Sequence, residues 1–144
     1  MIYTDKTKAA LRLAYEAHAG QADKSGLPYI HHPLHLAEQM DDEDAVCVAL
    51  LHDVVEDTDV TFAQIRGIGM SDAVMEALEL LTHGPEVPYL DYVARLAQND
   101  LARRVKIADL RHNSDLARLD KVTETDLARV RKYERALEML GSER

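Results

Sequence analysis

The spacing of apolar residues constrains the fold of this chain more than any other feature of its sequence. Apolar side chains recur every three or four positions, as in Ala10, Leu13, Ala14 and Ala17, and strict alternation is almost absent. A period near 3.6 residues places such side chains on one face of an α-helix, whereas a half-buried strand needs a period of two. The sequence therefore predicts an all-α fold.

Capping residues, glycines and prolines divide this pattern into about seven to eight helices. Helix starts are expected after Thr4 or Asp5, near Pro33, after Asp42, after Thr61, after Ser71, at Pro88, near residue 100 and after Thr123. Thr61 and Gln64 have the spacing of a capping box, and the short helix that they begin should end at the glycines 67 and 69. The helix capped by Asp42 is expected to reach about Glu56, and the one near residue 100 to reach about residue 117.

Length and composition favour one globular domain over residues 1–144. The chain is 47% hydrophobic and 30% charged, which is ordinary for a soluble protein. No apolar run approaches the ~20 residues of a membrane span, and the N-terminus lacks the apolar core of a signal peptide. Cys47 is the single cysteine, so no intramolecular disulfide can form. These features predict a cytoplasmic protein without membrane association.

The charge of the chain is negative and unevenly distributed. The formal net charge of −9 argues against a nucleic-acid binder, which needs a basic face. Ten of the 17 Lys and Arg residues nevertheless lie between Arg103 and Arg135, and nine of the 26 acids lie between Glu38 and Asp59. A basic segment beside an acidic one can hold a phosphate group near a metal ion. Two solvated helix faces would give the same pattern.

The segment ALLHDVVEDTD, residues 49–59, combines the most apolar stretch of the chain with a histidine and several acids. Burying unpaired charges costs several kcal/mol, so a partner must offset them. In a continuous helix His52 would lie above Glu56 and Asp53 above Asp57. An imidazole nitrogen with a carboxylate oxygen suits Mn²⁺, Fe²⁺ or Zn²⁺.

Two further segments offer partners for such an ion. IHHP, residues 30–33, places histidines at a helix entrance, with His32 expected just outside the helix; His31 and His35 are further candidates. VKIADLRHN, residues 105–113, places Asp109 in an apolar helical turn. Taken singly, each of these residues also has a structural explanation, as a surface carboxylate or a histidine that caps a helix. Two histidines and two aspartates together would leave positions open for water, as catalytic metal sites do.

Together these segments resemble the HD-domain metal-dependent phosphohydrolases, and specifically the hydrolase domain of the RelA/SpoT alarmone family. The resemblance is carried by KSGLPYIHHP, ALLHDVVEDT and KIADLRHN, which occur in this order from Lys24 to Asn113. It also includes AYEAHAGQ, residues 14–21, so it covers most of the chain. The resemblance implies a single HD-domain helical bundle.

The resemblance also implies roles for individual residues. The metal ligands would be His32, His52, Asp109 and Asp53, with His32 chosen because the family's ligand directly precedes the proline. The ion would be one divalent metal, usually Mn²⁺. Glu56 and Asp57 would be the catalytic acids that position and activate the attacking water.

The implied substrate is a small nucleotide, guanosine tetra- or pentaphosphate, from which pyrophosphate is removed at the 3′ position. The implied substrate-binding residues are Lys24, Ser25, Lys106, Asn113, Arg129 and Tyr133. Arg129 and Tyr133 are four residues apart and so share a helix face. A surface arginine and a tyrosine at the edge of the core would give the same pattern.

The sequence departs from the family pattern in the loop that precedes the first histidine. Asp23 stands where the family usually has an arginine that helps hold the guanine, and Leu27 stands where it often has glutamate. Both changes bear on substrate identity and leave the metal motif intact. The chain ends at Arg144, which suggests a short, stand-alone hydrolase without a synthetase domain.

Two other functions therefore stay open at this stage. One is a phosphohydrolase of the same scaffold that acts on another nucleotide or phosphorylated metabolite. The other is a catalytically silent module that binds metal or nucleotide, although such a module would not need the acids at positions 56 and 57.

Overall fold

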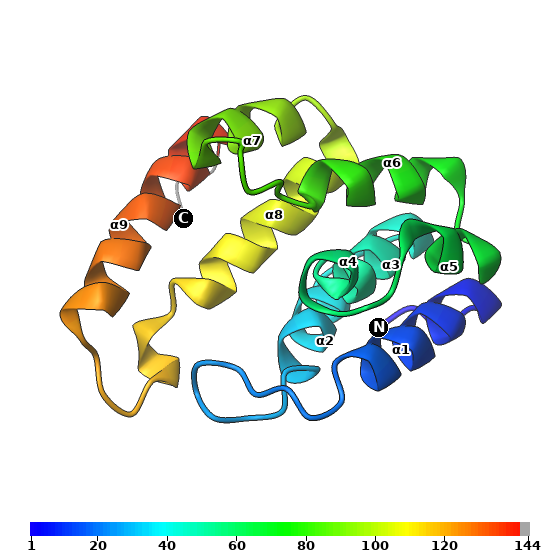
Figure 1. The fold of residues 1–144 in the computed structure, drawn as a ribbon, viewed down its shortest axis with the longest axis horizontal. Helices are drawn as coiled ribbons and strands as arrows, with labels where there is room; N and C mark the ends of the chain where they lie inside the picture. The colour runs from blue at the N-terminus through cyan, green and yellow to red at the C-terminus, as the bar shows by residue number, and fades with distance from the viewer. Residues whose placement is uncertain (142–144) are drawn as a thin grey trace.

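The computed structural model describes residues 1–141 and is built from helices (Figure 1). The helices are α1 (Asp5–Ala17), α2 (His31–Glu38), α3 (Glu43–Leu51), α4 (Val54–Asp57), α5 (Phe62–Gly67), α6 (Asp72–Leu81), α7 (Tyr89–Leu96), α8 (Asp100–Asn113), the 3₁₀ turn η1 (Leu116–Arg118) and α9 (Glu124–Met139). Within this range the extended pairing is limited to one isolated bridge between Ala22 and Pro28. The predicted all-α class is confirmed.

The predicted helix starts follow from local hydrogen bonds. The side chains of Thr4, Asp42, Thr61, Ser71 and Thr123 each accept a bond from a backbone N–H in the first turn of the helix that follows. Thr61 forms the predicted capping box with Gln64. Each such cap typically contributes about 1 kcal/mol, because it satisfies an amide that has no partner within the helix.

Two predicted boundaries near the site are wrong. The helix capped by Asp42 ends at Leu51, because Asp53 adopts φ −107° and ψ 0°, and a separate short helix begins at Val54. His52 and Glu56 therefore do not stack along one continuous helix. His32 lies inside α2, which begins at His31, rather than just outside it.

A third difference lies after α8. That helix ends at Asn113 rather than near residue 117, and η1 follows as a separate turn. The chain thereby leaves the axis of α8 and brings Arg118 toward the loop between α1 and α2, as the paths of the two segments in Figure 1 show.

The core is centred on α3. Every residue from Ala45 to Leu51 is buried, as is typical of a helix covered on all sides. This helix packs against α1, α2, α6 and α8. Because α3 is central, its C-terminal residues lie where α2 and α8 converge, and Cys47 is a buried free thiol within it.

None of the helices in the described residues combines the length and the apolar character that a bilayer span requires.

Candidate metal centre

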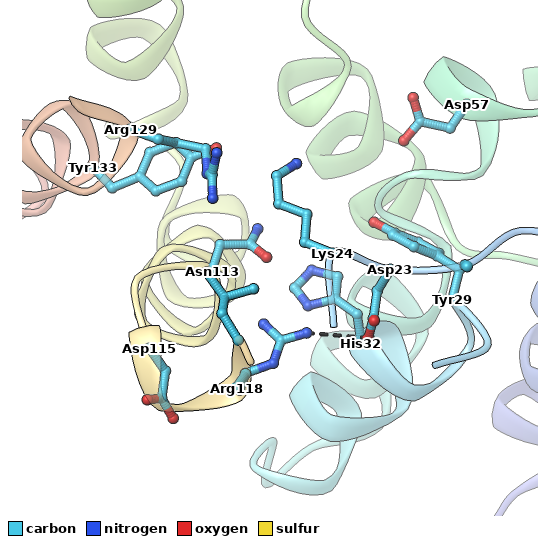
Figure 2. Close-up of a pocket in the computed structure, with 12 residues that line it drawn as sticks. Asp23, Lys24, Tyr29, His32, Asp57, Asn113, Asp115, Arg118, Arg129 and Tyr133 are labelled. Carbon is cyan, nitrogen blue, oxygen red and sulfur yellow. Dashed lines mark hydrogen bonds and ion pairs between the residues drawn. The ribbon is translucent and has the colours of Figure 1, made fainter. Parts of the chain in front are cut away.

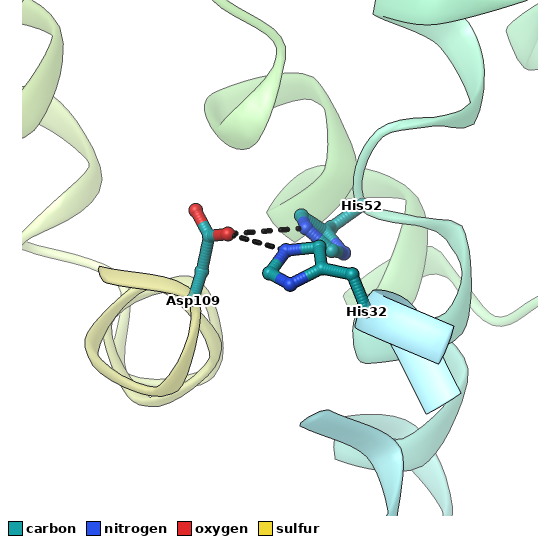
Figure 3. Close-up of side chains that lie close together, drawn as sticks. All are labelled: His32, His52 and Asp109. Carbon is teal, nitrogen blue, oxygen red and sulfur yellow. Dashed lines mark hydrogen bonds and ion pairs between the residues drawn. The ribbon is translucent and has the colours of Figure 1, made fainter. Parts of the chain in front are cut away.

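Three buried side chains from three helices converge on one point. His32 comes from α2, His52 follows α3, and Asp109 comes from α8. The ligand atoms of the three lie within 4.8 Å of one another. The Oδ1 atom of Asp109 is 2.7 Å from Nε2 of His32 and 3.5 Å from Nε2 of His52. Figure 3 shows the carboxylate pointing toward both rings.

The His52 ring is oriented by its own helix. Its Nδ1 lies 2.7 Å from the carbonyl oxygen of Ala49, so Nδ1 carries the proton that it donates there. Its Nε2 is buried and lacks a hydrogen bond, although it lies 3.0 Å from Oδ2 of Asp53. A buried nitrogen that faces two carboxylates without a hydrogen bond fits a cation.

The His32 ring is oriented by His112, whose Nδ1 lies 2.7 Å from Nδ1 of His32. Burial, together with the charge of Arg118, lowers the pKa of His112 to about 4. His112 is therefore neutral at pH 7, and its Nδ1 can accept a proton from Nδ1 of His32. In that tautomer Nε2 of His32, which lies 2.7 Å from Oδ1 of Asp109, carries no proton and can bind an ion. The sequence did not single out His112, although it belongs to the motif KIADLRHN.

The centre has an excess of negative charge in the absence of an ion. Burial by itself would lower the pKa of His52, but the charges of Asp53 and Asp109 raise that pKa well above its usual value. The site thus demands positive charge, which a divalent cation would supply in place of a proton. Two imidazoles with a carboxylate form a donor set suited to a transition-metal ion.

Asp53 lies beside the cluster of three rather than within it. Its carboxylate contacts Nε2 of His52 and accepts a hydrogen bond from the hydroxyl of Tyr29. The other histidines near His32 lie differently: His31 is exposed, and the ring of the exposed His35 stacks on His112 with 4.1 Å between ring centroids.

Asp109 is supported by two residues from the same helix. Nζ of Lys106 lies 2.9 Å from Oδ2 of Asp109, and Nδ2 of Asn113 donates to Oδ1 at 3.0 Å. Burial would raise the pKa of Asp109, but Lys106 and the two histidines hold that pKa well below its usual range. Lys106, expected to bind substrate, contacts this carboxylate and does not line the neighbouring cavity.

A cavity of about 210 Å³ adjoins the metal centre (Figure 2). His32 belongs to both. Four of the residues expected to bind substrate line the cavity, namely Lys24, Asn113, Arg129 and Tyr133. Ser25 does not line it; instead its hydroxyl donates to Oδ1 of Asp23 at 2.6 Å.

The two expected catalytic acids lie on α4, and Figure 2 shows Asp57 on the side of the cavity opposite Arg129. Asp57 lines the cavity, and partial burial, together with the charges of Asp53 and Glu56, raises its pKa to about 6. Glu56 does not line the cavity, and its Oε1 accepts the backbone N–H of His83 at 2.8 Å.

Comparison with known proteins agrees with this geometry. The model of the HD domain family matches residues 10–132, so this chain belongs to the HD-domain family, a fold of divalent-metal phosphohydrolases. A structure described as a metazoan ortholog of SpoT that hydrolyzes ppGpp superposes with a TM-score of 0.78, covering 97% of this chain and 88% of that one at 24% sequence identity.

Curated relatives share parts of the sequence. The bifunctional (p)ppGpp synthase/hydrolase SpoT of Escherichia coli is 30% identical over 123 residues, 75% of this chain and 17% of that protein. The guanosine-3′,5′-bis(diphosphate) 3′-pyrophosphohydrolase of Aquifex aeolicus is 41% identical over 68 residues, 44% of this chain and 10% of that protein. The chain thus spans only a small part of the length of these curated relatives.

Proposed function

We propose that this chain is a (p)ppGpp 3′-pyrophosphohydrolase that uses one divalent cation, Mn²⁺ in the first instance. The observation that carries the proposal is the buried cluster of His32, His52 and Asp109 beside a cavity that Lys24 and Asp57 line. The names of the relatives from Escherichia coli and Aquifex aeolicus support the substrate.

The cation would be held by His32, His52 and Asp109, with Asp53 beside His52. When bound, such a cation neutralises charge on phosphoryl oxygens and lowers the pKa of water. The carbonyl oxygen of Ala49 keeps His52 in the tautomer that leaves its Nε2 without a proton, and His112 bonds Nδ1 of His32. Lys106 and Asn113 hold the carboxylate of Asp109. The site is thus held in the binding geometry by hydrogen bonds around the ligands.

The reaction breaks the bond between the ribose O3′ and the phosphorus atom that it carries. Water adds to that phosphorus, pyrophosphate leaves with the new oxygen, and O3′ takes a proton, so that GDP or GTP remains. In this proposal a carboxylate oxygen of Asp57 accepts the proton of the attacking water, and Glu56 orients the segment by its bond to the amide of His83. Lys24 binds the phosphates.

The loop beside the cavity supports a second candidate function, a phosphohydrolase that acts on another nucleotide. Leu27, in the loop beside the cavity, is 51% exposed, and Asp23 replaces the arginine expected in that loop. A panel of nucleotides assayed for phosphate and for pyrophosphate separates the two candidates. Release of phosphate from a nucleoside monophosphate, with no pyrophosphate from ppGpp, would favour the second.

The direct test is the release of pyrophosphate from ppGpp by the purified chain with Mn²⁺. We expect Asp53→Ala to lose most of this activity, because the variant removes a carboxylate 3.0 Å from Nε2 of His52. Asp59→Ala is the matched control, since Asp59 is an exposed acid of the same segment that does not line the cavity. A wild-type protein that releases no more pyrophosphate than Asp53→Ala would disprove the proposal.

A further inference from the structure

We propose that Arg118, held in place by Asp23, is a specificity-determining residue that binds the purine base of the substrate and favours guanine. The inference rests on the function proposed above, because it names how the same cavity selects a nucleotide. Its basis is an ion pair between two segments 95 residues apart.

The carboxylate of Asp23 is directed away from solvent, and its side chain is only 4% exposed. Its Oδ1 accepts the backbone N–H groups of Ser25 at 2.9 Å and Leu27 at 3.1 Å. The carboxylate that replaces the expected arginine is therefore bonded to the backbone of its own loop and to Arg118. It does not simply repel a ligand in the cavity.

Arg118 extends from η1 to the cavity wall and is anchored on two sides. Its Nη2 lies 3.2 Å from Oδ2 of Asp23, and its Nη1 donates to the carbonyl oxygen of His112 at 2.9 Å. A guanidinium group has five N–H donors in a rigid plane. The two bonds hold that plane in one orientation and occupy two of the five donors. The remaining donors are available to a ligand, since Arg118 lines the cavity.

The charge of Arg118 determines which part of a nucleotide it suits. The carboxylate of Asp23 offsets the positive charge, which weakens attraction to phosphate but leaves the N–H donors. Lys24 lines the same cavity and makes no ion pair within residues 1–141, so it is better suited to phosphate. Guanine presents two acceptors, O6 and N7, on one edge, and a guanidinium fork matches both; adenine has a donor in place of O6.

The other arginine of the cavity lies in a different place. Arg129 is on α9 beside Tyr133, paired with Asp126 at 2.6 Å. Figure 2 shows Arg118 apart from both Arg129 and Asp57, near Asp23. Arg118 therefore contacts a part of the ligand distinct from the part that lies near the catalytic acids.

Calorimetric titration of the full chain, with Mn²⁺ present, by GDP and by ADP tests this proposal. We expect wild type to bind GDP more tightly than ADP. Arg118→Lys keeps the positive charge and loses the fork, so its affinity for GDP should fall on the order of 10-fold while that for ADP changes much less. Asp23→Asn should also reduce the preference for GDP, because the guanidinium loses its charged anchor.

The control is Arg66→Lys, which alters an arginine–aspartate pair of 2.9 Å between α5 and α6, away from the cavity. This variant should keep the wild-type preference. An equal loss of GDP and ADP affinity in Arg118→Lys would overturn the proposal by indicating a phosphate contact, and so would an unchanged ratio in both cavity variants. A wild type that lacks ppGpp hydrolysis yet prefers GDP would contradict the proposed function alone.

Should Arg118→Lys unfold at the assay temperature, as its melting curve would show, Asp23→Asn decides the question by the same ratio. In the hydrolysis assay, folded Arg118→Lys should raise KM for ppGpp about 10-fold and leave kcat near its wild-type value, because the lost contact is far from the bond that breaks. An equal fall in kcat with unchanged KM would contradict a role in binding the base.

Discussion

At the scale of single residues, the metal centre depends on side chains that do not themselves bind the ion. The Nδ1 atoms of His112 and His32 share a hydrogen bond of 2.7 Å, and without it the ring of His32 is free to change tautomer or rotate. The partners of metal-binding histidines commonly contribute 10–100-fold in metal affinity. In this site His112 is such a partner, and it can be tested by substitution.

We therefore expect His112→Phe to weaken Mn²⁺ binding by about 10–100-fold while the three ligands remain. His112→Asn should lose less, because its amide oxygen can accept the same hydrogen bond. Titration of Mn²⁺ followed by electron paramagnetic resonance measures the affinity, with the exposed His31→Phe as control. If His112→Phe binds Mn²⁺ as tightly as His31→Phe does, His112 has no role in holding His32.

At the scale of elements, α9 forms the cavity wall that carries Arg129 and Tyr133, and its first turn depends on Asp126. Hydrogen bonds from Thr123, with a further one from Arg129, lower the pKa of Asp126 to about 2. An aspartate in the unfolded chain titrates near 3.9. The carboxylate of Asp126 therefore stabilises the fold above about pH 4, and this contribution is lost as the pH falls from about 4 toward 2.

Asp126→Asn removes this contribution, so its free energy of unfolding should lie below that of wild type at pH 6 and approach it at pH 2. Urea denaturation at pH 2, 4 and 6 measures the difference. Asp120→Asn, which changes an exposed acid in the loop before α9, serves as the control and should show no such convergence. A difference between wild type and Asp126→Asn that is the same at all three pH values would contradict the assignment.

Elements also show what the sequence could and could not predict. Helix starts such as Ser71 and Thr123 were predicted because a cap bonds to an amide three residues away. The break at Asp53 was not predicted, and there the carboxylate of Asp53 accepts a hydrogen bond from Tyr29, 24 positions earlier, a contact that no local pattern marks. Local patterns thus predicted where helices begin better than where the central helix ends.

At the scale of the whole molecule, residues within short motifs were predicted, whereas contacts between distant segments were not. His32, His52 and Asp109 were predicted from short motifs that resemble a family, and the fold brings the three together. The contact between Arg118 and Asp23 joins segments 95 residues apart, and no local pattern marks either residue as a partner of the other. The contact depends on the three-dimensional path of the chain, because α8 ends at Asn113 and η1 then changes the direction of the chain.

The metal centre also links the parts of the fold, since its ligands come from α2, the end of α3 and α8. A cation that binds only the folded chain stabilises it by RT ln(1 + [L]/Kd), about 2.7 kcal/mol when the free cation is at 100 times Kd. We therefore expect Mn²⁺ to raise the melting temperature of wild type by several degrees, and a chelator to reverse the rise. Scanning calorimetry with and without Mn²⁺ measures it.

The variants His52→Gln and Asp109→Asn should lose most of this rise, whatever their melting temperatures without metal. The increment is the informative quantity, because Asp109→Asn also leaves the buried Lys106 without its carboxylate partner and lowers the starting stability. Asp59→Ala should keep the full increment. If Mn²⁺ raised the melting temperature of all four proteins equally, the cation would be binding elsewhere, and the three helices would not be joined through these ligands.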